Sequence, residues 1–196
     1  EALLGGLDGR LAAEGWLGVG DAGRRTGRRE AAARAYREAL LAAPRSPAAE
    51  SAARWVLEAG TPPPELALAV ARALDRAGDG SGALEAYDAY VEGVGARGEV
   101  PEAGARVERA RLMTTVPSRQ EAGIEEWREL ARHPDPAVGV RTLELWRQLR
   151  LRQGERGKAA TLRRWLVERY PDTDAAAQVV FLRGDAAHDR QAWDEA

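Results

Sequence analysis

Apolar residues recur along this chain every three or four positions, and they rarely alternate with polar residues as they would in strands. Alanine, leucine, arginine and glutamate dominate, and these residue types favour helices. Glycine or proline interrupts the pattern roughly every 12 to 18 residues, which is about the length of a helix in a helical repeat. The pattern therefore predicts an all-α protein of roughly ten to eleven helices.

The clearest pair of helices is predicted over residues 11–44. A break at Gly27 separates the two helices, and Pro44 ends the second because proline cannot continue a helix. The second helix has its apolar residues at positions i, i+4, i+7 and i+8, so they share one face. The residues expected on the packed faces are Trp16, Val19 and Gly20 in the first helix, and Ala32, Tyr36, Ala39 and Leu40 in the second.

Similar pairs are predicted at about 64–94, 101–133 and 136–170, with a truncated pair at 174–196 and an extra helix at about 47–59. The pair at 64–94 repeats the spacing of the first with Ala83, Tyr87 and Tyr90. The pair at 101–133 matches poorly, since Glu126 stands where an aromatic residue is expected. Residues expected to face inward elsewhere are Ala52, Trp55, Val56 and Ala59; Ala122, Trp127 and Leu130; and Trp146, Ala159, Trp165 and Tyr170, with Pro171 ending that helix.

The order of residues in 13–44 (W-x2-V-G, a glycine break, A-x3-Y-x2-A, then P) resembles the tetratricopeptide repeat. The C-terminal part, from Tyr170-Pro171 to Trp193-Asp194-Glu195-Ala196, is similar to periplasmic bacterial members of that family, although Arg190-Gln191 stands where a glycine turn is usual. These members include lipoproteins of outer-membrane assembly and of cell division, and the superhelical region of soluble lytic transglycosylases. The resemblance implies one right-handed helical-hairpin solenoid over residues 1–196.

The resemblance further implies a non-catalytic scaffold for protein–protein or cell-envelope interactions, placed in the periplasm or at the envelope. A cytoplasmic scaffold is the alternative location. The alternative function is the non-catalytic superhelical part of a lytic transglycosylase acting on peptidoglycan, with its catalytic domain outside this chain. A third alternative is a structural spacer. A protein or peptide is the expected partner, and peptidoglycan is the second candidate. Because the chain opens without Met and stops within a predicted helix, we expect a longer protein.

Composition excludes several classes of function. The net charge of −2 over 196 residues gives no overall attraction for nucleic acid. Because the chain has no cysteine, it has no disulfide, no thiolate nucleophile and no cysteine-ligated metal. No apolar run approaches the roughly 18 residues of a membrane-spanning helix.

No pattern of catalytic, cofactor-binding or metal-binding residues emerges. The histidines, His133 and His188, lack metal-ligand partners at helical spacing. Residues 78–82 (GDGSG) lack the strand and the Lys-Ser/Thr of a phosphate-binding loop, so we predict a turn. Glu50-Ser51 matches a dipeptide of the transglycosylase catalytic domain, but the Gly-Leu-Met-Gln that follows in that family is absent. Glu50 is expected in the first turn of a helix.

Six tryptophans are many for this length, and they could stack on sugar rings of a glycan. Because nearly all of them fall on apolar stripes, we favour a role in the core. They are Trp16, Trp55, Trp127, Trp146, Trp165 and Trp193.

Residues 141–169 carry nine basic and three acidic side chains, and few acids stand at i,i+4 from a base. The span is therefore a candidate anion-binding or partner-binding patch, with a solvated helix face as the alternative. A smaller cluster of Arg24, Arg25, Arg28 and Arg29 is offset by Glu30. One lysine and no asparagine exclude the usual carboxylate clamp of chaperone-binding tetratricopeptide domains. The candidate patch comprises Arg141, Arg147, Arg150, Arg152, Arg156, Arg163 and Arg164, with Lys158 and Arg169 nearby.

Overall fold

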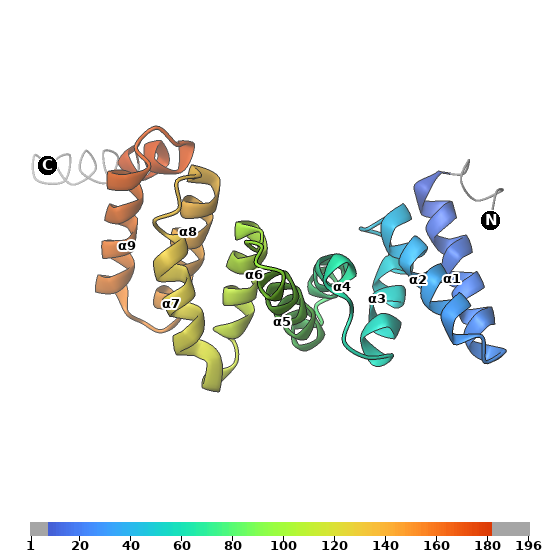
Figure 1. The fold of residues 1–196 in the computed structure, drawn as a ribbon. Coiled ribbons are helices and arrows are strands. Elements are labelled where there is room, and N and C mark those ends of the chain that lie inside the picture. Colours follow the sequence, from blue (N-terminus) through green and yellow to red (C-terminus); the bar gives the residue numbers. More distant parts are fainter. Residues whose placement is uncertain (1–7, 182–196) are drawn as a thin grey trace, which may run out of the picture. The chain divides into compact units, whose positions relative to one another are not determined.

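The computed structural model describes residues 8–181 and is helical throughout that range, with no strand (Figure 1). The chain divides after Leu112 into two compact units. The helices are α1 (Gly9–Arg25), α2 (Arg29–Ala42), α3 (Pro47–Glu58), α4 (Pro64–Arg76), α5 (Gly80–Ala96), α6 (Ala103–Met113), the 3-10 helix η1 (Pro117–Arg119), α7 (Gln120–Leu130), α8 (Pro136–Arg152) and α9 (Arg156–Arg169), followed by a helical segment at 174–181.

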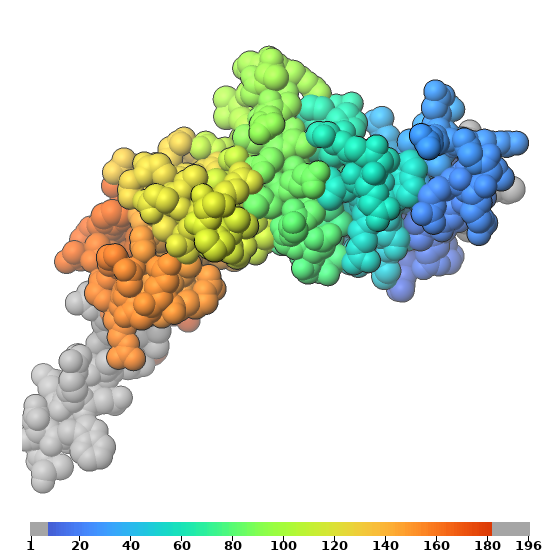
Figure 2. Space-filling view, turned by 90° about the horizontal axis from the view of Figure 1, so that it is seen from below, coloured from blue at the N-terminus to red at the C-terminus, as the bar shows by residue number. Residues whose placement is uncertain are grey.

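In the first unit, helices that follow one another along the chain also lie next to one another. The most extensive contacts join α1 to α2 and α4 to α5, which lie within the spans 11–44 and 64–94. Helix α3 packs against α1 and α2 on one side and against α4 on the other, so it bridges the two pairs. In the space-filling view, α2, α3 and α4 adjoin from blue to cyan (Figure 2).

A glycine allows α1 and α2 to approach closely. The ring of Tyr36 lies against Gly20, where an added Cβ would be 2.6 Å from Cε1 of the ring. Tyr36 Oη donates a hydrogen bond of 2.6 Å to Asp21 Oδ1, which holds the ring across α1. Gly27 connects the helices with a φ of 73°, a conformation that residues with a side chain rarely adopt. Ala32, Tyr36, Ala39 and Leu40 are all buried, as predicted.

The turn predicted at residues 78–82 is shorter in the structure: Gly78 and Asp79 lie between the helices, and residues 80–82 already belong to α5. α4 ends before Gly78, and Asp79 caps α5 by accepting a hydrogen bond from the Gly82 N–H at 2.9 Å. Ala83 and Tyr87 are buried between the helices. Farther along, Gly93 of α5 leaves room for the Pro64 ring at the start of α4.

In the second unit, Tyr170 connects three helices. Its ring lies over Gly139 of α8, where any Cβ would collide with the phenol. Its hydroxyl lies 3.1 Å from the Ala131 carbonyl oxygen and 2.9 Å from that of His133, so it donates to the carbonyls that follow α7. These carbonyls have no partner within the helix, and the tyrosine supplies one. Trp146 and Trp165 meet edge to face, with ring centroids 6.3 Å apart.

Three residues expected inside are exposed. Val19 lies about 100° around α1 from Gly20, outside the packed face. Ala122 faces away from the stripe of α7, which instead passes through Gly123, Ile124 and Trp127. Ala59 lies past the end of α3. These three residues show that apolar spacing alone does not determine where the buried face of a helix ends.

The remaining residues of the predicted helix pairs differ in their burial. Gly20, Ala159 and Tyr170 are buried, whereas Trp16 is only partly covered. Pro44 and Pro171 are exposed because they follow the helices they end, and the Pro44 carbonyl accepts a hydrogen bond from Arg76. Trp193, His188 and most of the pair at 174–196 lie outside the described residues.

Candidate functional site

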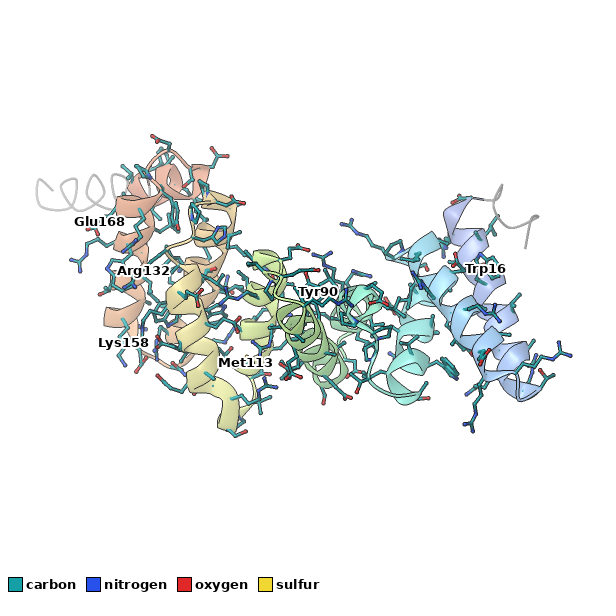
Figure 3. All side chains as sticks on the ribbon, in the orientation of Figure 1. Trp16, Tyr90, Met113, Arg132, Lys158 and Glu168 are labelled. Atoms are coloured by element: carbon teal, nitrogen blue, oxygen red, sulfur yellow. The ribbon has the colours of Figure 1, made fainter. Side chains whose placement is uncertain are left out.

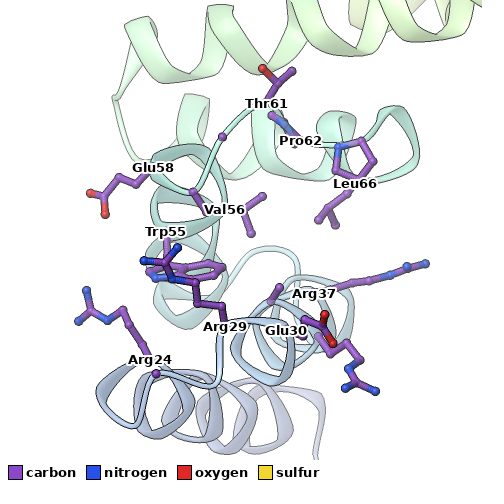
Figure 4. Close-up of a pocket in the computed structure, with 16 residues that line it drawn as sticks. Arg24, Arg29, Glu30, Arg37, Trp55, Val56, Glu58, Thr61, Pro62 and Leu66 are labelled. Atoms are coloured by element: carbon purple, nitrogen blue, oxygen red, sulfur yellow. The ribbon is translucent and has the colours of Figure 1, made fainter.

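A groove of about 940 Å³ lies in the first unit between α2 and α3 (Figure 4). The turn between α1 and α2 borders one end, and the loop from α3 to α4 borders the other. Its volume is within the usual range of binding clefts. The lining residues with the largest side chains are Arg24, Arg29, Glu30, Arg34, Arg37, Trp55, Val56, Glu58, Pro62 and Leu66.

The floor of the groove is apolar. Val56 and Leu66 are more than nine-tenths buried, and Pro62 is buried beside them. Trp55 is only partly buried, so part of its indole remains open to the groove. The stiff connector of residues 61–64 (TPPP) lets the chain turn from α3 into α4 while Pro62 and Pro63 line the site. This floor can accept an apolar side chain of a ligand.

Trp55 is positioned by the residues that join α1 and α2. Its ring centroid is 4.4 Å from that of Tyr36, and the planes are tilted by 32°. Tyr36 is itself fixed by its close contact with Gly20 and by its hydrogen bond to Asp21. Burial, together with that bond to a carboxylate, raises the pKa of Tyr36 to about 12, so the phenol stays protonated at neutral pH. The repeat-like residues of the first pair thus support the indole that the groove exposes.

Arginines line the rim of the groove. Arg29, Ala33 and Arg37 stand at i, i+4 and i+8 on α2, beside its buried stripe, and all three are exposed. Arg24 and Arg34 complete the rim. Within residues 8–181, none of these four arginines has a carboxylate oxygen within 4 Å. Over the same residues, the rim acids Glu30 and Glu58 have no basic side chain within that distance.

Several arginines elsewhere in the first unit are paired. Arg97 contacts Glu65 at 2.9 Å, and Arg72 contacts Glu102 at 2.6 Å. Arg111 contacts Asp75 at 2.5 Å and Glu108 at 2.6 Å, and although burial acts against its charge, these carboxylates raise its pKa. Arg25, Arg28, Arg45 and Arg54 of this unit also have no ion pair in the described part of the chain, so what distinguishes the groove is that four such guanidinium groups border one apolar floor.

The candidate patch at residues 141–169 is more fully paired than its sequence indicated. Glu155 binds Arg150 at 2.8 Å and Lys158 at 2.6 Å, and these bases lower its pKa, the hydrogen bond from Lys158 most. Arg164 lies 3.8 Å from Glu168. The expectation of missing partners was thus wrong for these bases. It overlooked pairing across the turn between α8 and α9, where Arg150 and Glu155 are five residues apart.

The other residues of this patch are dispersed. Arg141, Arg152, Arg156 and Arg163 are exposed, and Arg147 is partly exposed. Arg156 and Arg163 are seven residues apart on α9 and share a side, while Arg164 lies about 100° around from Arg163. Figure 3 shows Lys158 near the start of α9 and Glu168 near its end. Arg163 and Arg164 nevertheless border one pocket of about 470 Å³ together with Glu168, whereas the other bases of this region do not line it.

The tryptophans divide into two groups. Trp127 and Trp146 are buried, as the apolar stripes predicted. Trp16, Trp55 and Trp165 are only partly covered, so the expectation of core positions was too broad. Of these three, Trp55 lines the groove. Apolar periodicity alone did not separate these two groups.

The structure adds few chemical features elsewhere. Within the described range no three His, Asp or Glu side chains are placed to hold a metal ion. The Nδ1 atom of His133 accepts a hydrogen bond of 3.1 Å from the Asp135 N–H. Glu50 lies in the first turn of α3, as expected. Over the same residues, helices long and apolar enough to cross a bilayer are absent.

No family model, curated protein or solved structure matches this chain. The groove itself was missed by sequence reasoning, which treated Arg24 and Arg29 as a small cluster offset by Glu30. The usable signal was the spacing of Arg29 and Arg37 on α2, since residues eight apart share a helix face.

Proposed function

We propose that this chain is a non-catalytic, tetratricopeptide-like scaffold that binds a protein partner through the groove between α2 and α3. The observation that carries the proposal is the combination of an apolar floor containing a partly exposed, supported indole with a rim of four arginines that lack ion pairs. Such a site offers area and charge for recognition without groups arranged for bond-breaking chemistry.

The arrangement of helices in the first unit supports a scaffold. Each helix pair leaves an apolar face that its neighbour covers, as α3 does between the pair α1–α2 and α4. Binding by such a stack uses surfaces shared by consecutive helices, and the groove is built in this way from α2, α3 and the loop that follows. The tetratricopeptide assignment itself rests on the sequence pattern of residues 13–44.

A second candidate function is envelope binding through the second unit. Arg152, Arg156 and Arg163 are exposed bases without ion pairs, and they could contact the carboxylates of peptidoglycan. A pulldown with purified sacculi at low and high salt tests this candidate. Salt-sensitive retention that is lost in an Arg152→Glu/Arg163→Glu variant would support it, and equal behaviour of both proteins would exclude this route. The transglycosylase relationship remains a proposal from sequence resemblance.

Selection from a random peptide library tests the scaffold function. The full chain should enrich peptides that bind with dissociation constants of about 1 to 100 μM, corresponding to roughly 5 to 8 kcal/mol. Trp55→Ala should weaken these peptides about tenfold, whereas Trp16→Ala, which alters a partly covered tryptophan outside the groove, should leave them unchanged. The proposal would be contradicted if no peptide were enriched, or if the enriched peptides bound the wild type and Trp55→Ala equally well.

A further inference from the structure

We propose that the groove between α2 and α3 is specific for an extended acidic segment, in which two carboxylates bind Arg29 and Arg37 and an apolar side chain between them rests on Trp55. This inference rests on the proposed function and specifies the ligand of the same groove. It differs from the carboxylate clamp excluded by composition, since arginines on one helix face replace lysine and asparagine.

The charge of the rim indicates an anionic partner. Four arginines face two glutamates around the groove, and within residues 8–181 these six side chains make no ion pairs. Glu65 at the start of α4 binds Arg97 at 2.9 Å, and the charge of Arg37 acts on it without forming an ion pair. Arginine binds carboxylates through two parallel hydrogen bonds, and these charge-assisted bonds are about twice as strong as neutral ones. A partner carboxylate would therefore meet guanidinium groups that no carboxylate of this chain occupies.

The separation of the arginines sets the length of the segment. Arg29 and Arg37 are eight residues apart, which is about 12 Å along α2. An extended chain advances about 3.3 Å per residue, so this distance corresponds to about four residues. The expected motif therefore has acidic residues three or four positions apart. Both arginines line the groove that contains Trp55 and Leu66, and Figure 4 draws Arg29 to the left of Arg37.

The floor selects an apolar side chain between the two acids. Trp55, Val56 and Leu66 form an apolar surface, and the stacking of Trp55 on Tyr36 fixes the indole before a ligand arrives. A side chain fixed in advance loses less conformational freedom on binding. Aromatic or leucine side chains in the segment would contribute most to the free energy of binding, because they bury the largest area against the indole.

Single-stranded nucleic acid is a less suitable ligand for the same surface. Glu30 and Glu58 stand on the rim among the arginines and would face a continuous phosphate backbone. An acidic peptide with two spaced carboxylates can avoid them. The net charge of −2 also gives the whole chain no long-range attraction for nucleic acid.

Fluorescence anisotropy with the full chain tests the inference. The probe is a labelled ten-residue peptide with two glutamates flanking a Leu-Phe pair. One matched peptide replaces the glutamates by glutamine, and another replaces Leu-Phe by Ser-Ser. The protein variants are Arg29→Glu/Arg37→Glu, the milder Arg29→Gln/Arg37→Gln, and the control Arg45→Glu/Arg132→Glu. The control makes the same charge change on exposed arginines that lie outside the groove and have no ion pair with any described residue. Circular dichroism confirms that each variant folds.

The acidic peptide should bind the wild type at least about tenfold more tightly than either matched peptide. Arg29→Glu/Arg37→Glu should weaken it about tenfold or more, Arg29→Gln/Arg37→Gln about threefold to tenfold, and the control less than about twofold. Equal loss in the control would overturn the inference, because binding would then follow net charge.

Three further outcomes show whether the inference fails alone or together with the proposed function. If library selection yields neutral peptides that depend on Trp55, the scaffold function stands and the acidic specificity is wrong. If oligo(dT) binds as tightly as the acidic peptide and is lost in the same variants, the groove is a general polyanion site and the inference is overturned. If no peptide from any source binds, the proposed function fails together with the inference.

Discussion

Two helical hairpins, α1–α2 in the first unit and α8–α9 in the second, pack in the same way. In each, a tyrosine on the second helix or just after it lies over a glycine of the first helix, Tyr36 on Gly20 and Tyr170 on Gly139. In each, a glycine with positive φ connects the two helices. Both hairpins are also rich in arginine.

Their surfaces differ in where the bases without ion pairs lie, since Arg152, Arg156 and Arg163 of the second hairpin have none among the described residues but do not border an apolar groove together. In the second hairpin, Glu155 binds Arg150 and Lys158, and Arg164 has Glu168 nearby. In the first, Arg29 and Arg37 have no such partner and border an apolar groove. Shared packing therefore does not imply a shared surface, and the placement of a few carboxylates distinguishes a solvated face from a binding site.

The largest expected effect concerns the shared packing. Gly139→Ala places a methyl group in the Tyr170 ring and should destabilise the second unit by about 3 kcal/mol or more. Gly20→Ala should cost the first unit about 2 kcal/mol, since its Cβ would be 2.6 Å from the Tyr36 ring. Urea unfolding followed by circular dichroism measures both.

The control for these variants is Gly157→Ala, at a helical position with no neighbouring atom within 4 Å. It should raise stability by about 0.5 to 1 kcal/mol, because alanine favours helix over glycine. If Gly139→Ala unfolds at the same urea concentration as the wild type, the close contact with Tyr170 does not contribute as the structure indicates.

The next prediction adds a carboxylate to the groove of the first hairpin, so that its arginines become paired like Arg150 and Lys158 in the second. Ala33→Glu adds a carboxylate at i,i+4 from both Arg29 and Arg37, as Glu155 provides for its neighbours. It should weaken binding of the acidic peptide about tenfold, with little change in stability. Ala33→Gln, similar in size but uncharged, is the control for anisotropy titrations. Equal weakening by both variants would show that bulk, and not charge, closes the groove.

A smaller effect concerns the hydrogen bond between Tyr36 and Asp21. Tyr36→Phe removes the hydrogen bond to Asp21 and should cost about 1 kcal/mol at neutral pH. The folded pKa of about 12 exceeds the value of about 10 for an unfolded tyrosine. The folded state therefore holds its phenol proton more tightly, and this stabilisation is complete below pH 10 and is lost as the pH rises through 12.

Urea midpoints from pH 8 to 12 measure this difference. The advantage of the wild type over Tyr36→Phe should be constant up to about pH 10 and should then shrink. A constant advantage across the whole range would mean that the phenol titrates equally in the folded and unfolded chains.

The smallest effect is expected when a carboxylate that pairs with bases is removed from the second hairpin. Glu155→Gln removes the partner of Arg150 and Lys158 and should lower the melting temperature slightly near pH 7. Because the pKa of Glu155 is lowered in the folded state, its contribution is present at neutral pH and is lost as the pH falls through that pKa. The two melting temperatures should therefore converge in acid. A variant that remains less stable at low pH would point to a packing defect.

Sequence periodicity predicted most helices and their breaks, because apolar spacing and glycine or proline punctuation are local signals. It placed α2, α4 and α8 close to their observed bounds and identified the buried faces through Tyr36 and Tyr87. It failed where the outcome depends on the neighbouring helix. The exposure of Val19, the opening of Trp55 to the groove, and the pairing of Arg150 with Glu155 all depend on which element lies opposite.

The contact between Gly139 and Tyr170 also constrains how this chain can diverge. The two positions are 31 apart in sequence but occupy one volume, so a side chain can be gained at one only if it is reduced at the other. Among diverged relatives, a larger residue at the equivalent of Gly139 should therefore occur with a smaller residue at the equivalent of Tyr170. The same inverse relation should hold for Gly20 and Tyr36, so these two coupled exchanges would mark common descent after overall similarity has faded.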